Sequence, residues 1–112
     1  MLNFQNLDVY RCAVAFLGRA APLADHMPRG YASLGDQLPR AALSVPLNIA
    51  EGNGRLHGDA SHHYAIARGS ALECAAVLDA CAALGFVPVE ELAPLNELIE
   101  RVVSMLTKMA LK

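Results

Sequence analysis

The spacing of apolar residues is the feature that most constrains what this chain can fold into. In the last third of the chain, apolar side chains follow one another at three- or four-residue intervals, which gathers them on one face of an α-helix. They are Leu92, Leu95, Ile99, Val102 and Leu106. Three further blocks show helical spacing, and no stretch keeps the period-two alternation of a half-buried strand for long. The pattern therefore predicts an all-α protein.

Four helices are expected, separated by turns rich in proline and glycine. The breaks fall at HMPRGY, GNGRLHGD and GFVP, where these residue types oppose helix continuation. Asn6 is expected to cap the first helix and Gly85 to end the third. Short connections favour antiparallel neighbours, so residues 1–112 are expected to form one domain, an antiparallel up-down-up-down four-helix bundle. The expected helices span residues 7–24, 33–53, 59 or 61 to 84, and 89–111.

Two prolines fall inside the second expected helix. An interior proline removes a backbone donor and crowds the preceding turn, at a cost of about 3 kcal/mol. Pro39 avoids most of this cost if it lies near the true start of the helix. Pro46 cannot, so we expect a kink near residues 42–45. The Ser44 hydroxyl is a candidate partner for a carbonyl that the kink frees.

The composition indicates burial beyond one small core. Hydrophobic residues make up 54% of the chain and charged residues 18%, against roughly 45–50% and 25% in typical domains. This excess of apolar residues points to a partner subunit. The net charge of −2 gives no overall basic field of the kind that dedicated nucleic-acid-binding domains carry.

The cysteines and the N-terminal sequence indicate a cytoplasmic protein. Cys12, Cys74 and Cys81 are odd in number and lack C-x-x-C spacing, so we expect buried, reduced side chains without a disulfide or metal site. The opening MLNFQNLDVYR has neither the charged start nor the apolar core of a signal peptide. Charged residues interrupt each apolar stretch before about 18 residues, so no membrane span is expected.

A narrow polar stripe crosses the otherwise apolar second block, RAALSVPLNIAEGNGR. At about 100° per residue its five polar side chains fall within an arc of about 80°, much narrower than a solvated helix face. In the third block, Ser70 and Glu73 likewise interrupt an apolar stripe. We expect a polar seam between packed helices or between subunits, and both placements stay open. Its seven residues are Arg40, Ser44, Asn48, Glu51, Arg55, Ser70 and Glu73.

Within this seam, Arg40 and Glu73 are expected to form an ion pair. The second and third helices should pack antiparallel across their glycine-rich turn, which puts Arg40 level with Glu73. A half-buried carboxylate is well matched by the planar fork of a guanidinium. Since losing one member of such a pair is costly, Glu73→Ala is predicted to destabilise the fold or the assembly, which melting and oligomer mass would test.

A second polar cluster surrounds the turn between these two helices and raises the question of catalysis or metal binding. Its spacing lacks the H-x-x-x-H and Glu-x-x-His patterns of helical metal sites, and GNGRLHG does not match a phosphate-binding P-loop. We therefore expect turn-exposed or capping histidines, with no catalytic residue, metal, cofactor or small-molecule substrate. The cluster comprises Glu51, His57, Asp59, His62 and His63.

Together these motifs resemble a known bacterial family. LPRAALSVPLNIAEGNGR followed by YAIARGSALE, with FQNLDVYRCAVAF before and LNELIERVVSMLTKM after, is similar to the four-helix-bundle proteins encoded by intervening sequences of 23S rRNA genes, often labelled S23 ribosomal proteins. The resemblance implies a bundle that assembles into a ring-like homopentamer, in a family with no settled biochemical activity. The accessory protein of diversity-generating retroelements is similar in fold and assembly, and it uses a basic surface to engage its reverse transcriptase and nucleic acid.

Two functions are consistent with the residues and the resemblance. The favoured one is a non-enzymatic homo-oligomeric scaffold that binds a protein or nucleic-acid partner through its ring. The alternative is an accessory factor that binds RNA or DNA through a basic surface. The candidate nucleic-acid contacts are Arg29, Arg55, Arg68 and Arg101, with Arg40 as a further member.

Overall fold

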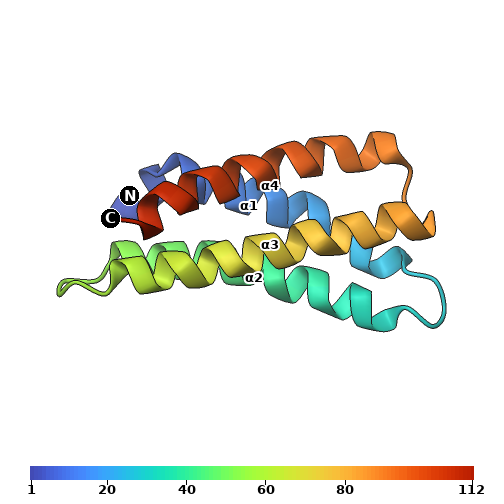
Figure 1. Ribbon diagram of the computed structural model, residues 1–112, viewed down its shortest axis with the longest axis horizontal. Coiled ribbons are helices and arrows are strands. Elements are labelled where there is room, and N and C mark those ends of the chain that lie inside the picture. The colour runs from blue at the N-terminus through green and yellow to red at the C-terminus, as the bar shows by residue number, and fades with distance from the viewer.

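The structure of residues 1–112 is a computed structural model, and its regular secondary structure is entirely helical (Figure 1). Two short 3₁₀ helices accompany four α-helices, so the all-α prediction is confirmed. None of these helices combines the length and the apolar character needed to cross a membrane. In chain order the elements are η1 (Asn3–Asn6), α1 (Asp8–Ala20), η2 (Ala21–His26), α2 (Ala32–Asn53), α3 (Ala60–Leu84) and α4 (Val89–Ala110).

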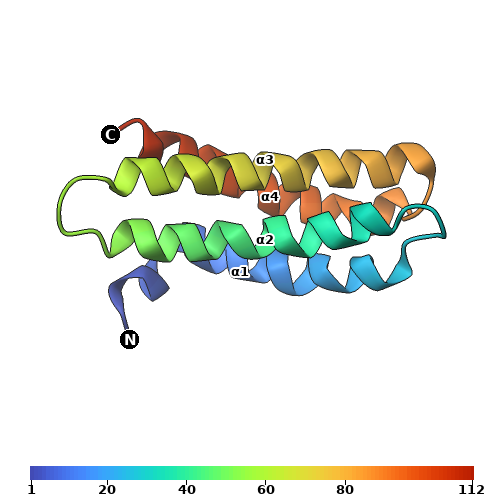
Figure 2. The same ribbon diagram turned by 90° about the horizontal axis from the view of Figure 1, so that it is seen from below.

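Consecutive α-helices run antiparallel and lie side by side (Figures 1 and 2). The turn between α2 and α3 lies at the same end of the molecule as both termini, and the other two connections lie at the opposite end. Both α1 and α3 pack against α2 and α4, so the four helices surround a common interior. The whole molecule measures 46 × 26 × 23 Å. The predicted up-down-up-down four-helix bundle is confirmed.

One apolar core fills the space between the helices. The cysteines predicted to be buried, Cys12, Cys74 and Cys81, belong to this core as free thiols. Each helix also contributes large side chains that are almost completely removed from solvent, and this burial is the main favourable contribution to folding. They include Phe16 from α1, Leu38 and Ile49 from α2, Leu78 from α3, and Leu92, Ile99 and Leu106 from α4.

The helices begin and end close to the predicted residues, except for the first predicted helix, residues 7–24. Leu7 precedes α1 without a side-chain cap, and Asn6 belongs to η1, so the predicted Asn6 cap is wrong. The α-helix also ends early and continues as η2, which contains Pro22 in its first turn. Since proline has no N–H to donate, it cannot extend the α-helical hydrogen-bond ladder there. Gly85 ends α3 with φ of 73°, as predicted.

Both prolines of the second block lie in the interior of a single α-helix, α2. Because α2 begins at Ala32, Pro39 is not near the helix start, contrary to the option that the sequence left open. Pro46 is buried. The Ser44 hydroxyl makes no bond to a freed carbonyl of its own helix, because it faces α3 and accepts a hydrogen bond there.

Candidate functional site

Polar side chains of α2 and α3 form a chain of hydrogen bonds along the line where these two helices pack. The Ser70 hydroxyl of α3 donates to Ser44 Oγ of α2 at 2.9 Å. One turn further along α2, Asn48 Nδ2 donates to the Ser44 carbonyl at 2.9 Å and to Ser44 Oγ at 3.2 Å. These three half-buried side chains link the two helices near the middle of their contact.

His63 extends the chain toward the α2–α3 turn and is the one buried side chain of polar type, with 8% of its surface exposed. Arg55 donates to His63 Nε2 from Nε at 3.1 Å and from Nη2 at 2.8 Å. A guanidinium only donates, so Nε2 is the acceptor and the ring proton lies on Nδ1. His63 Nδ1 lies 3.4 Å from Asn48 Oδ1, which accepts a hydrogen bond from this N–H. No buried side-chain nitrogen or oxygen lacks a partner.

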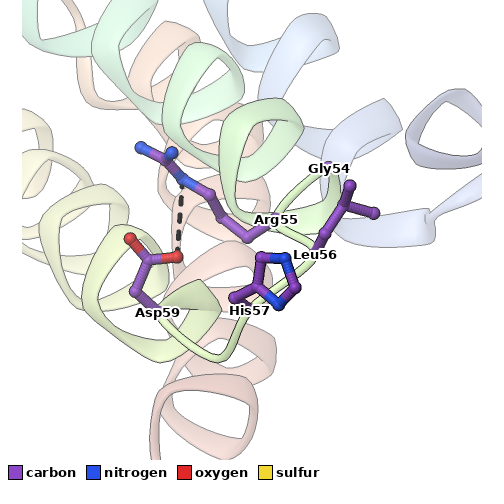
Figure 3. Close-up of a pocket in the computed structure, with 5 residues that line it drawn as sticks. All are labelled: Gly54, Arg55, Leu56, His57 and Asp59. Carbon is purple, nitrogen blue, oxygen red and sulfur yellow. Dashed lines mark ion pairs between the residues drawn. The ribbon is translucent and has the colours of Figure 1, made fainter.

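Arg55 lies just beyond α2 and ends the chain of hydrogen bonds. Its Nη2 lies 2.8 Å from Glu51 Oε1, and its Nε lies 3.5 Å from Asp59 Oδ1. Figure 3 shows the guanidinium facing Asp59 across the turn. Both carboxylates are more than half exposed, so solvent screens these ion pairs and each adds little stability. Their effect is to hold the guanidinium against His63.

Five of the seven predicted seam residues therefore come together: Ser44, Asn48, Glu51, Arg55 and Ser70. The other two do not. Arg40 and Glu73 are both exposed and take part in no ion pair or side-chain hydrogen bond. The predicted Arg40–Glu73 ion pair within the chain is therefore wrong. The two residues are level with each other, but they lie farther round their helices toward solvent than the bonded serines do.

His63 and Asp59 also belong to the seam, where the sequence pattern had predicted only members of the turn cluster. His63 stands seven residues before Ser70. A seven-residue interval returns to nearly the same face of an α-helix, so this spacing could have placed His63 on the stripe that faces α2. Asp59 precedes α3 and makes no side-chain cap bond to that helix. Its carboxylate instead lies near Arg55.

Gly52 allows α2 to approach α3 beside His63. A Cβ atom at this buried glycine would lie 2.8 Å from Tyr64 Cε1 and 3.1 Å from His63 Cβ. Both distances are shorter than ordinary van der Waals contact. A residue without a side chain is therefore needed here for the two helices to pack as they do.

The structure brings only some residues of the turn cluster together. The hollow at the turn is lined by Gly54, Arg55, Leu56, His57 and Asp59 (Figure 3). Arg55 in this hollow is already bonded to Glu51, Asp59 and His63. His57 and His62 are exposed, and no three His, Cys, Asp or Glu side chains are placed to share a metal ion.

The candidate nucleic-acid contacts do not share one surface. Arg29 is exposed in the connection between η2 and α2, and Arg55 belongs to the seam at the opposite end of the molecule. Arg68 Nε donates to Thr107 Oγ1 at 2.7 Å between α3 and α4. Arg101 lines a groove between α1 and α4.

Beside the seam, α2 and α3 expose three large apolar side chains. Leu43 and Leu47 are 46% and 58% exposed, stand four residues apart and share one side of α2. Ile66 of α3 is 40% exposed. The Ser44–Ser70 bond fixes the register, and both Leu47 and Ile66 lie about one turn from it toward the α2–α3 turn. Together with Arg40 and Glu73, these residues make up what we call the α2–α3 outer face.

Comparison with known proteins identifies one family. The family model described as 23S rRNA-intervening sequence protein matches residues 5–108. This match covers α1, α2, α3 and all but the last two residues of α4, and it confirms the resemblance that the sequence motifs indicated. No curated protein matches the chain.

Proposed function

This chain belongs to the family of 23S rRNA-intervening sequence proteins, and we propose that it is a non-enzymatic scaffold, a cytoplasmic homopentamer that presents its ring to a protein or nucleic-acid partner. The observation that carries this proposal is the exposure of Leu43, Leu47 and Ile66 on two neighbouring helices. A cluster of large apolar side chains on a small surface is typical of an interaction site.

The charge distribution of α3 supports self-association. Among the 25 residues of this helix only Arg68, Glu73 and Asp79 are charged, whereas the solvent side of a helix is normally rich in charge. Full burial of one leucine or isoleucine contributes roughly 1.5–3 kcal/mol. Covering half-exposed side chains would contribute a fraction of that each, repeated at every contact of a closed ring.

The polar groups of the molecule are used in structure, which supports a non-enzymatic role. The bonded seam side chains, from Ser44 to His63, satisfy one another, and no buried side-chain nitrogen or oxygen lacks a partner. Among the cysteines, burial raises the pKa of the Cys74 thiol to about 12, with a further contribution from the charge of Glu73, and burial also raises the pKa of Cys81. A thiol with a raised pKa supplies little nucleophilic thiolate near neutral pH.

The mass of the protein in solution tests the proposal. The number five rests on the family resemblance, and a pentamer has five times the chain mass of 11.9 kDa. Native mass spectrometry and light scattering coupled to size exclusion, across micromolar concentrations, should give that mass. A monomer at every concentration would refute the scaffold proposal, and a different closed oligomer would refute the number alone.

The alternative function, binding of RNA or DNA, has less support from the geometry. Arg29 and Arg101 are exposed and form no ion pair, but they and the other candidate arginines are dispersed over different parts of the bundle. Phosphate contacts by arginine make affinity fall steeply with salt. Titration of labelled RNA and DNA at low and physiological salt tests this alternative, and no binding at low salt would remove it.

A further inference from the structure

The two charged residues of the α2–α3 outer face lie together at one end of it. Arg40 stands four residues before Ser44, and Glu73 stands three residues after Ser70. Because Ser44 and Ser70 are bonded across antiparallel helices, both charges lie about one turn from that bond, on the side away from the α2–α3 turn. Leu47 and Ile66 lie on the other side of it. The face therefore has an apolar part and a charged part.

Arg40 and Glu73 differ from the charges at the other end of the seam. Arg55 forms ion pairs with Glu51 and Asp59, whereas Arg40 and Glu73 form none although they lie on neighbouring helices at the same level. The surface thus carries one unpaired cation and one unpaired anion beside exposed leucines. Such a surface is complementary in charge to a second copy of itself.

We infer that the α2–α3 outer face is where one copy of this chain binds the next, with Arg40 of one copy paired to Glu73 of the other and Leu43, Leu47 and Ile66 buried beside that pair. This inference rests on the proposed self-association and names its surface. Apolar side chains around the pair would exclude water, and an ion pair in a less polar setting is screened less than an exposed one. Arg40 and Glu73, which are unpaired in the single chain, therefore help to determine which surfaces bind each other.

A second copy fits this face better than an unrelated partner does. The α2 side of the face carries the cation and the α3 side carries the anion, each beside exposed apolar side chains. The α2 side of one copy can therefore bind the α3 side of the next, which is the head-to-tail contact that a closed ring requires. Charge pairs of this kind fix the register of an interface and disfavour wrong pairings. The Glu73→Ala substitution is accordingly expected to weaken the assembly and leave the fold of the single chain intact.

Substitution of one exposed leucine tests the apolar part of the face. Leu47→Asp should weaken association at least about tenfold, measured as the dilution at which the oligomer mass is lost. Leu72→Asp is the matched control, since Leu72 is 44% exposed and lies on the side of α3 away from α2, toward α4. Its oligomer mass should not change. Circular dichroism should show that both variants remain helical, and Leu47→Ala provides a milder variant if Leu47→Asp fails to fold.

Charge reversal tests the pair itself. Arg40→Glu and Glu73→Arg should each weaken association, because like charges then meet across the interface, and the double variant should restore it. Mixing the two single variants should also restore most of the association, since unlike variants meet with opposite charges and can alternate at four of the five contacts of a pentameric ring. A pair formed within one chain would be repaired by the double variant but not by mixing. Asp79→Arg, another exposed acid of α3, is the control and should leave association unchanged.

The outcomes separate this inference from the proposed function. If the wild-type protein is oligomeric but Leu47→Asp and both charge reversals leave its mass unchanged, the outer face is not the interface and the scaffold proposal stands. The same holds if Leu72→Asp dissociates the oligomer as strongly as Leu47→Asp, or if mixing the charge variants restores nothing. If the wild-type protein is monomeric at every concentration, the proposed function itself is wrong.

Discussion

At the scale of single residues, the buried ring of His63 organises the polar seam. It receives two hydrogen bonds from Arg55 and lies within hydrogen-bonding distance of Asn48. The His63 side chain of α3 therefore connects α2 with the α2–α3 turn. Buried polar groups add little stability when bonded but are costly when a partner is removed. The seam therefore specifies how α2 and α3 pair more than it strengthens their contact.

Replacement of His63 should destabilise the fold. His63→Ala removes the acceptor of Arg55 and the donor to Asn48, and we expect the free energy of unfolding to fall by about 1–3 kcal/mol. Urea unfolding followed by circular dichroism measures this change. The neighbouring exposed His62 provides a matched control, and His62→Ala should change stability by no more than about 0.5 kcal/mol. Equal effects of the two substitutions would show that the seam bonds do not matter for stability.

Alkaline pH should destabilise the protein partly through Cys74. Burial raises the pKa of this thiol from 9.0 to about 12, so the folded state holds the thiol proton more tightly than the unfolded state does. This contribution to stability is complete below pH 9 and is lost as pH rises toward 12. Between pH 9 and pH 11 the wild-type protein should lose more unfolding free energy than Cys74→Ala. Parallel pH profiles for the two proteins would contradict the expectation.

At the scale of elements, two buried glycines of α2 allow this helix to pack closely against its neighbours α3 and η2. Gly52 permits contact with Tyr64 and His63, and Gly35 similarly lies where a Cβ atom would be 2.9 Å from the Ala24 carbonyl oxygen of η2. Elsewhere in the helices glycine has no such role, and a Cβ atom at Gly18 would meet nothing within 4 Å. The identity of these buried glycines is thus set by the neighbouring element and not by their own helix.

Substitutions of two helical glycines should have opposite effects. Gly52→Ala must displace the Tyr64 ring or separate the helices, and overpacking of this kind costs about 1–3 kcal/mol. Gly18→Ala adds a methyl group in open space and should stabilise α1 by roughly 0.5–1 kcal/mol, because alanine is the better helix former. Thermal and urea unfolding of both variants measures the difference. A neutral Gly52→Ala would contradict the need for glycine at this contact.

At the scale of the whole molecule, the bundle buries one core and still leaves apolar side chains on the outside. The helices α1 to α4 each turn an apolar side inward, yet Leu43, Leu47 and Ile66 remain exposed together on two of them. With a net charge of only −2, electrostatic repulsion between copies is weak. Both properties favour association of the folded chain with itself.

Association should make thermal stability depend on protein concentration. A folded state that binds copies of itself is stabilised by mass action, so Tm of the wild-type protein should rise as concentration increases across the micromolar range. In Leu47→Asp, Tm should depend less on concentration, because the variant loses one of the three apolar side chains of the outer face. Differential scanning calorimetry at several concentrations measures both. A constant Tm for the wild-type protein would contradict self-association.

The sequence by itself determined most of the secondary structure and part of the site. Helical spacing predicted four antiparallel helices, Gly85 predicted the end of the third, and the arc from Ser44 to Arg55 predicted a polar seam on α2. These features depend on local chemistry: on the 3.6-residue period, on backbone freedom at glycine, and on the phase of side chains around one helix. They need no knowledge of the neighbouring element.

Only the tertiary structure decided which polar groups meet. His63 joined the seam while Arg40 and Glu73 stayed outside it, because a hydrogen bond depends on the rotation of two helices relative to each other as well as on their level. The interior position of Pro39 was likewise settled by packing between elements. The sequence shows which side of each helix is polar or apolar, one helix at a time. Only packing of the core fixes how the helices are rotated relative to one another.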